Sequence, residues 1–195
     1  GFGGGAALVS QLGGRLINDG LVTPFESFGY FGCAFLLVAA GAGLLMQAPP
    51  DVAEARVERL KPGGIIGRRA FQILYAAMFT GLAAGFVVNA NLKEFYAGNN
   101  LKAGVFAVSL FAVANALGRI GWGLVFDRVR SSVAVQLNLA SQAMTVLLAF
   151  WALHSAAGLL TFAFLAGLNY GGVLVVYVST VSRVWGRERV GEVYG

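Results

Sequence analysis

Charged residues are scarce in this chain: they make up 12% of its 195 residues, whereas 57% are hydrophobic. A soluble domain of this length needs a polar surface over its core, and so few charged side chains do not supply one. The polar residues also gather in short stretches between long apolar runs. The composition therefore excludes an ordinary soluble domain and indicates an integral membrane protein.

The residues that build metal centres and disulfides are nearly absent as well. Cysteine and histidine occur once each, as Cys33 inside an apolar run and His154 at the end of one. A single residue of each kind builds neither a disulfide framework nor a metal cluster, so we expect no metal and no cofactor. No catalytic triad or phosphate loop is visible, and the glycine-rich residues 1–6 lack the preceding strand of a dinucleotide fingerprint. We expect a protein that is not an enzyme.

The net charge of +5 raises the question of nucleic acid. The basic residues are divided among several loops rather than gathered on one face, so we expect no nucleic-acid partner. The 28 glycines fit closely packed membrane helices, because glycine lets helix backbones approach each other.

Six apolar stretches are long enough, or nearly so, to cross a bilayer, which takes about 20 residues. They cover approximately residues 1–18, 27–47, 70–92, 103–126, 132–153 and 156–184. The expected fold is an all-α, multi-pass bundle of about six transmembrane helices. Gly1 opens an apolar helix without a methionine, and the last residues lead into a further segment. Both ends are therefore expected to be interior points of a longer chain.

A polar, mixed-charge stretch at 48–69 divides the apolar stretches into two before it and four after it. The expected units are residues 1–47, the linker 48–69 and residues 70–195. Alternate loops lie on opposite sides of a membrane, and the set containing the linker carries ten basic residues against three in the other set. Cytoplasmic loops are the ones enriched in lysine and arginine. The linker is therefore expected in the cytoplasm.

A tight turn after the fourth apolar stretch carries the most informative pattern. Gly123 is followed four residues later by Asp127 and Arg128, and then by Arg130. Gly123 would allow close helix approach, Asp127 would accept hydrogen bonds from the end of a neighbouring helix, and the two arginines would pair with carboxylates or lipid headgroups. Such a turn can latch two helices in one conformation and release them in another. An ordinary charged turn obeying the positive-inside bias explains the spacing equally well.

This turn resembles the signature loop of the major facilitator superfamily of transporters. In that family the loop follows the second and eighth of twelve helices on the cytoplasmic side, and a long central cytoplasmic loop separates two bundles of six. The resemblance implies that 48–69 is the central loop and that this chain covers about the fifth to the tenth helices.

Further stretches resemble the oxalate/formate antiporter family within that superfamily. They are Gly1-Phe2-Gly3-Gly4-Gly5-Ala6, Asn89-Ala90-Asn91-Leu92-Lys93, Asn169-Tyr170-Gly171-Gly172, Trp185-Gly186 and Val190-Gly191-Glu192-Val193-Tyr194-Gly195. The chain departs from the family at Val178, where members often have a helix-bending proline.

Arg119 is the leading candidate for a substrate ligand. It lies 8 residues before Asp127, or roughly 12 Å along a helix, which places it well inside the bilayer. An arginine at that depth is costly and marks a functional site by default, and its planar fork suits a carboxylate. Asn115 lies one turn earlier on the same face. Snorkelling of Arg119 to the cytoplasmic interface is the alternative.

The resemblance implies that Arg119 matches the family's carboxylate-binding arginine on the eighth helix, and that the partner lysine on the eleventh falls beyond Gly195. It also implies that Tyr170 lines the substrate cavity. A helix-packing role for this tyrosine is equally compatible with the sequence. Other polar residues inside the apolar stretches are expected to bond between helices: Asn89, Asn91, Gln136, Asn138 and Gln142.

The expected function is secondary active transport of a small organic anion, such as a mono- or dicarboxylate, by antiport or with a proton. A carrier for nitrate or another inorganic anion of the same superfamily is the nearest alternative, and a channel or receptor-like protein is the alternative from another class. The expected partners are the anion and the lipid of a plasma or inner membrane. The oligomeric state is open, with a monomer expected at full length.

Overall fold

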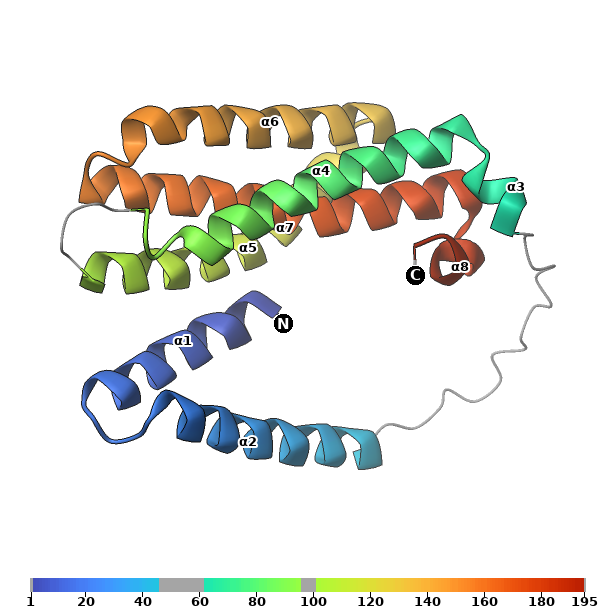
Figure 1. Ribbon diagram of the computed structural model, residues 1–195. Helices are drawn as coiled ribbons and strands as arrows, with labels where there is room; N and C mark the ends of the chain where they lie inside the picture. Colours follow the sequence, from blue (N-terminus) through green and yellow to red (C-terminus); the bar gives the residue numbers. More distant parts are fainter. Residues whose placement is uncertain (1, 46–61, 96–100, 195) are drawn as a thin grey trace.

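The computed structural model describes residues 2–45, 62–95 and 101–194, and these form helices joined by short turns (Figure 1). No strand occurs within those ranges. Residues 48–61 of the expected linker lie outside the described residues. The helices are α1 (Phe2–Asn18), α2 (Pro24–Leu45), α3 (Pro62–Ile66), α4 (Arg69–Asn91), α5 (Leu101–Arg128), α6 (Ser131–Ala152), α7 (Ala156–Trp185), the 3-10 turn η1 (Arg187–Arg189) and α8 (Val190–Tyr194).

The six long helices fall on the six apolar stretches, with ends that differ by a few residues. Five of them, α2, α4, α5, α6 and α7, are long and apolar enough to cross a membrane. The sixth, α1, has 17 residues. The prediction of an all-α chain with several candidate spans is confirmed, and the five indicate a membrane protein. The short helices α3 and α8 were not predicted, because elements of five residues carry no readable periodicity.

Local sequence explains where several helices begin and end. At the start of α2, the Thr23 amide donates to the Glu26 carboxylate at 2.7 Å, and the Glu26 amide donates back to the Thr23 hydroxyl at 3.3 Å. This reciprocal pair is a capping box, and Pro24 fits the first helical position. Ser155 caps α7 through the amide of Gly158, and α7 ends at Gly186 with φ of 96°. The helix is continuous through Val178, the position at which the departure from the family pattern occurs.

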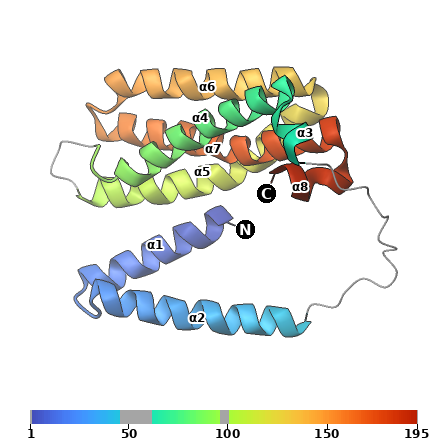
Figure 2. The ribbon, with the colours of Figure 1, turned by 45° about the vertical axis from the view of Figure 1, so that its right-hand side comes forward.

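The helix α7 is the centre of a four-helix group, with α5 on one side and α4 and α6 on the other (Figures 1 and 2). Of its most apolar 18-residue stretch, 56% is buried inside the protein. Two apolar clusters surround it, one around Tyr177 and Trp185 and the other around Leu159 and Phe162. The residues that follow the linker therefore pack around one axis.

Glycines allow α5 and α7 to pack with their backbones in contact. A Cβ atom added to Gly118 would overlap the backbone of Leu168, and one added to Gly167 or Gly171 would overlap the backbone of Phe111 or Asn115. Small residues are the usual means by which membrane helices come this close. The two helices therefore form one tightly packed pair.

Polar side chains connect α7 to α6, and α6 to α4. Asn169 of α7 accepts from Ser141 at 2.8 Å and donates to Thr145 at 2.9 Å. Asn138 donates to the backbone carbonyl of Asn169 at 3.1 Å, and Gln142 donates to the carbonyl of Gly81 in α4 at 2.8 Å. The expectation of bonds between helices is confirmed for Asn138 and Gln142.

The same expectation is wrong for the three other polar residues. Asn91 is exposed and donates to the Val87 carbonyl of its own helix. Asn89 and Gln136 are also exposed. Gln136 lines a groove together with Thr180 and Trp185 of α7. The linear pattern alone did not reveal which polar residues of α4 or α6 would be buried against a neighbour.

The helices that precede the linker, α1 and α2, lie together and apart from the α4–α7 group except where α1 contacts α5 (Figure 1). Gln11 of α1 donates to the Ser109 hydroxyl of α5 at 2.6 Å. This bond lies in the later half of α1 and the earlier half of α5. Because α2 leads from α1 to the linker and α4 leads from the linker to α5, these halves lie away from the linker. The α1–α5 contact is therefore at the end of the bundle opposite to the linker.

Candidate functional site around Arg119

Arg119 lies on α5, eight residues before Asp127 and roughly 12 Å along the helix from it. Its side chain is half-buried. A charged side chain at such a depth costs about 2.5–3.5 kcal/mol when it faces lipid. Packing beside polar groups reduces that cost, so the surroundings of Arg119 determine what it can do.

Asn115 precedes Arg119 by one helical turn and faces α7. Its side chain is 7% exposed, and its backbone carbonyl lies against Gly171. Among the described residues, its Oδ1 atom has no hydrogen-bond partner. Buried amide oxygens are nearly always bonded. This oxygen can only accept a hydrogen bond, so the Asn115 amide would have to present its amino group to contact an anion.

Tyr170 of α7 closes the other side of this region. Its ring lies against Gly85 of α4, where a Cβ atom would overlap it. It meets Phe86 edge-on with ring centroids 5.9 Å apart, and lies 5.8 Å from the Phe111 ring of α5. Contacts from α4 and α5 hold the ring rigidly against α7, and the phenol remains half-buried.

The charge of Arg119 acts on the phenols of two tyrosines, Tyr170 and Tyr194. Tyr194 lies in α8, which is tied to α4 by a hydrogen bond of 2.6 Å from the Tyr75 hydroxyl to the Val193 carbonyl. Burial raises the pKa of the Tyr194 phenol, the nearby Tyr75 raises it further, and Arg119 lowers it in part. The structure therefore brings Asn115, Arg119 and Tyr170 into one neighbourhood and adds Tyr194.

Sequence reasoning missed Tyr194 as a site residue. The stretch around it carried the family resemblance, but a five-residue helix folded back under α4 has no signature of its own. The signal that was present is a tyrosine eight residues after Gly186, the residue that marks the end of α7. That spacing is too common to select one residue.

The residues of the predicted latch are at the surface of the turn between α5 and α6. Asp127, Arg128 and Arg130 are exposed. Arg128 donates to the Leu124 carbonyl of its own helix at 2.9 Å. Across the described ranges, Asp127 makes no hydrogen bond or ion pair. In this conformation the expected bond from Asp127 to a neighbouring helix is not formed.

Gly123 also differs from its expected role. A Cβ atom added there would meet only the Val175 side chain at 3.8 Å, which is ordinary van der Waals contact. Close approach of α5 to α7 occurs instead at Gly118, one turn and a half earlier. The expectation that Gly123 is a point of close helix approach is wrong for this conformation, because among the described residues its added Cβ atom meets a side chain at an ordinary distance and no neighbouring backbone.

Arg183 makes the interhelical contact that the turn residues do not make. From the last turn of α7, its two guanidinium nitrogens donate to the carbonyls of Phe126 and Val129, each at 3.2 Å. The guanidinium also lies 4.0 Å from the centroid of the Phe126 ring. A cation at the carboxyl end of α5 satisfies orphan carbonyls and complements the helix dipole. Sequence reasoning had used Arg183 only to orient the chain.

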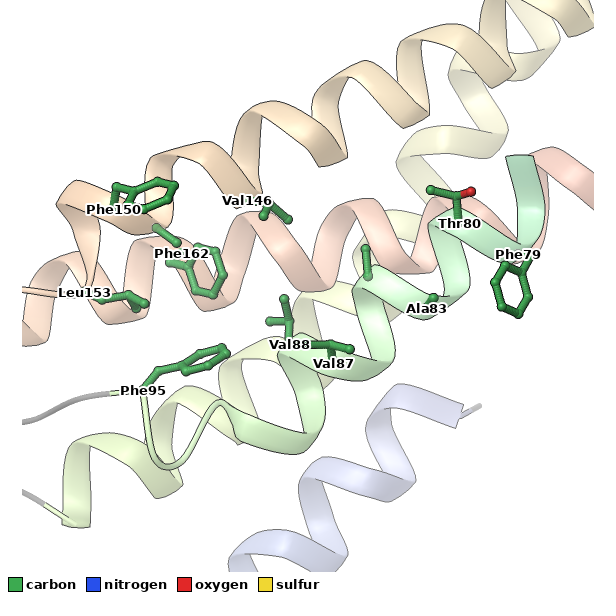
Figure 3. Close-up of a pocket in the computed structure, with 12 residues that line it drawn as sticks. Phe79, Thr80, Ala83, Val87, Val88, Phe95, Val146, Phe150, Leu153 and Phe162 are labelled. Carbon is green, nitrogen blue, oxygen red and sulfur yellow. The ribbon is translucent and has the colours of Figure 1, made fainter. Parts of the chain in front are cut away.

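An apolar groove with a volume of about 690 Å³ lies between α4, α6 and α7 (Figure 3). Phe79, Val87, Phe95 and Phe150 line it, and Thr80 supplies its single hydroxyl. None of the candidate site residues is among its lining. An anion loses its hydration there without gaining a donor, so this groove does not fit a charged substrate.

Metal ligands do not cluster within the described ranges: no group of three or more histidine, cysteine, aspartate or glutamate residues could hold an ion. The arrangement around Arg119 offers one positive charge, one amide and phenols. Such a set can bind and release an anion, and it contains no nucleophile paired with a base.

Comparison with known proteins gives no match: neither a family model, nor a curated protein, nor a solved structure is similar enough to this chain. The resemblance to the major facilitator superfamily and to the oxalate/formate antiporters therefore stays a prediction.

Proposed function

We propose that this protein is part of a secondary transporter for small organic anions, of the mono- or dicarboxylate kind, that works by alternating access. The observation that carries the proposal is Arg119. It is half-buried inside a candidate membrane span, one helical turn from the buried Asn115 and within the electrostatic reach of Tyr170 and Tyr194. A charged residue inside a membrane span is a functional-site candidate with a physical reason.

The chemistry of this group fits a carboxylate. The guanidinium fork can donate two parallel bonds to the two oxygens of a carboxylate, and such charge-assisted bonds are among the strongest in proteins. Phenol hydroxyls can donate to the same ligand, and the Asn115 amide can rotate to present its amino group. A site of donors around one cation holds an anion without covalent chemistry.

The packing supports a motion in which groups of helices rock as rigid bodies rather than one in which single helices bend. Glycines join α5 and α7 into one pair with backbones in contact, so Arg119 and Tyr170 would move together. Arg183 holds the end of α5 from α7 at the turn that resembles the family's gating loop. In a carrier, the four-helix group would tilt as one body against α1 and α2, and the site would face each side in turn.

The test is binding of oxalate and formate to the purified, intact protein, comparing the wild type with Arg119→Lys and Arg119→Gln. Losing the bidentate contact should weaken binding by roughly 30- to several thousand-fold, equivalent to about 2–5 kcal/mol. Arg119→Lys should bind weakly, because lysine keeps the charge and loses the fork. If Arg119 only snorkels to the interface, Arg119→Lys should be nearly silent.

Arg128→Gln is the matched control. It removes an arginine from the same helix, at an exposed position whose one hydrogen bond within the described part of the chain goes to its own helix, so binding should stay within about twofold of wild type. Thermal stability of each variant separates lost binding from lost folding. Variants that fold and bind both anions like wild type would make Arg119 a membrane anchor and remove the basis of the proposal.

A further inference from the structure

A second cavity, with a volume of about 550 Å³, lies between α1, the carboxyl end of α4 and the start of α5. Unlike the apolar groove of Figure 3, it is lined by two cations and two amides. Its lining residues are Gln11, Gly14, Arg15, Asn18, Lys93, Val105 and Phe106.

The two cations come from parts of the chain that lie on either side of the linker. Arg15 belongs to the last turn of α1. Lys93 follows α4 and its backbone lies directly on Gly104 of α5, where a Cβ atom would be 2.7 Å from the Lys93 carbonyl oxygen. The close contact with Gly104 holds Lys93 at the start of α5. The cavity is therefore completed only when α1 and the α4–α7 group meet.

The base of the cavity is the α1–α5 contact. Gln11, which lines the cavity, donates to Ser109 at 2.6 Å, and Gly14 leaves room beside Val105. This contact is at the end opposite to the linker. The cavity thus lies beside the point at which the two parts of the chain close together.

Neither cation is neutralised by a carboxylate within the described ranges. No ion pair is formed there by Arg15 or Lys93. Asp19 and Glu94 are near them in sequence, but neither lines the cavity. Two positive charges facing one polar cavity produce a local potential that attracts anions and raises their local concentration.

We propose that this cavity is a capture site for small anions at the mouth of the bundle away from the linker. This inference rests on the proposed function, since it supplies the place where an anion waits before it reaches Arg119. An anion held between Arg15 and Lys93 offsets the repulsion between charges on the two parts of the chain. Its binding therefore favours the conformation in which α1 and α5 are in contact, and its departure favours their separation.

The test measures the potential inside the cavity with a cysteine reporter that leaves both cations in place. In the intact protein with Cys33→Ser, Asn18→Cys places a thiol in the cavity lining. Its reaction rate is measured with a negatively and a positively charged methanethiosulfonate reagent at low salt. The ratio of interest is the rate with the negative reagent divided by the rate with the positive reagent. This ratio should be higher for the thiol in the cavity than for a free thiol in solution.

Arg15→Gln and Lys93→Gln should each lower that ratio about three- to fivefold, because each removes one unit charge from the lining of the same hydrated cavity and acts on the two reagents in opposite directions. Arg128→Gln removes a charge at the other end of the 28-residue helix α5 and should leave the ratio nearly unchanged, because the interaction between charges falls with distance. Oxalate should slow the reaction of both reagents, and the slowing should weaken when either cation is removed. A ratio that responds to neither cation would overturn the proposal.

Two further measurements distinguish a soluble anion from a lipid headgroup, and this cavity from the Arg119 site. In vesicles of neutral phosphatidylcholine, protection by added oxalate indicates a soluble anion. If protection instead requires anionic phosphatidylglycerol and oxalate has no effect, the occupant is a lipid headgroup and the proposal is overturned. In the Arg119→Gln background, protection should persist. Failure of the proposed transport function would appear as unaltered anion binding in Arg119→Gln, whereas failure of this inference would appear as loss of the charge ratio.

Discussion

The helices α2 and α7 are equally apolar over their most apolar stretches, yet the structure uses them in opposite ways. Of that stretch, 56% is buried in α7 and 0% in α2. Both contain several glycines. In α7, Gly167 and Gly171 lie four residues apart on one face and meet the backbone of α5, whereas a Cβ atom added at Gly29 or Gly32 of α2 meets nothing within 4 Å.

This difference shows that hydropathy predicts which helices can insert into a membrane, but not which helices pack against one another. Lipid tails are as apolar as leucine side chains, so an apolar helix in a membrane gains little by choosing another helix over lipid. What distinguishes α7 is small residues at a four-residue spacing and an asparagine, Asn169, that finds partners on α6. The comparison can be tested by adding or removing these features.

The largest effect is expected from Gly171→Ala in α7. Its Cβ atom would overlap the Asn115 backbone of α5, so the two helices must separate. We expect a loss of about 3 kcal/mol or more, because the obstruction is backbone rather than a movable side chain. Gly32→Ala in α2 should leave stability within about 1 kcal/mol of wild type or raise it. Thermal unfolding of the detergent-solubilised protein measures both.

Gly123→Ala sharpens the same test within α5, because its Cβ atom would meet only Val175 at 3.8 Å. It should be as well tolerated as Gly32→Ala. Equal losses for Gly171→Ala and Gly123→Ala would contradict the assignment of close backbone contact to particular glycines.

A smaller loss is expected from Asn169→Leu, which keeps the branched outline of the side chain but is larger and forms no hydrogen bonds. The substitution removes the hydrogen bonds to Ser141 and Thr145 and leaves those hydroxyls inside the bundle. We expect about 1–2 kcal/mol of destabilisation, since interhelical bonds in membranes contribute modestly and unpartnered polar groups add a cost. Asn89→Leu, on an exposed face of α4, is the control. If Asn169→Leu is as stable as Asn89→Leu, the polar contacts of Asn169 do not hold α6 to α7.

Arg183→Gln should cost about 1 kcal/mol, because it removes a cation from the carboxyl end of α5 together with its contact with the Phe126 ring. In a transport assay it should change turnover more than Asp127→Asn does, since Asp127 makes no interhelical bond to any described residue in this conformation. Both should leave anion affinity within a few-fold. If anion affinity collapses while turnover is intact, Arg183 and Asp127 belong to the binding site and not to the gate.

The smallest effect is expected from Tyr194→Phe and is confined to high pH. Burial raises the pKa of this phenol above its ordinary value of about 10. The neutral form is therefore favoured in the folded state, and its contribution is fully present below the unfolded pKa and lost as the pH rises through the folded pKa. The wild type should lose stability above about pH 10 more steeply than Tyr194→Phe. Parallel pH–stability curves would show that Tyr194 is exposed.

Much of the secondary structure was predictable from the sequence, and much less of the site was. Long apolar runs and the capping signals at Thr23 and Ser155 place helix ends to within a few residues. Arg119 and Asn115 were recognisable because polar residues inside an apolar run are costly. Tyr194 and Arg183 were not, since each acquires its contacts from a helix that is distant in sequence.

The amino-acid sequence by itself determined that this chain forms apolar helices, where they begin and end, and that an arginine lies inside one of them. These properties depend on local composition and on the thickness of a bilayer. The tertiary structure alone decided that α7 is central and α2 peripheral, that Gly118 rather than Gly123 meets α7, and that Arg15 and Lys93 share a cavity. These outcomes depend on which helix faces meet, and helices that are equally apolar do not encode that choice in their hydropathy.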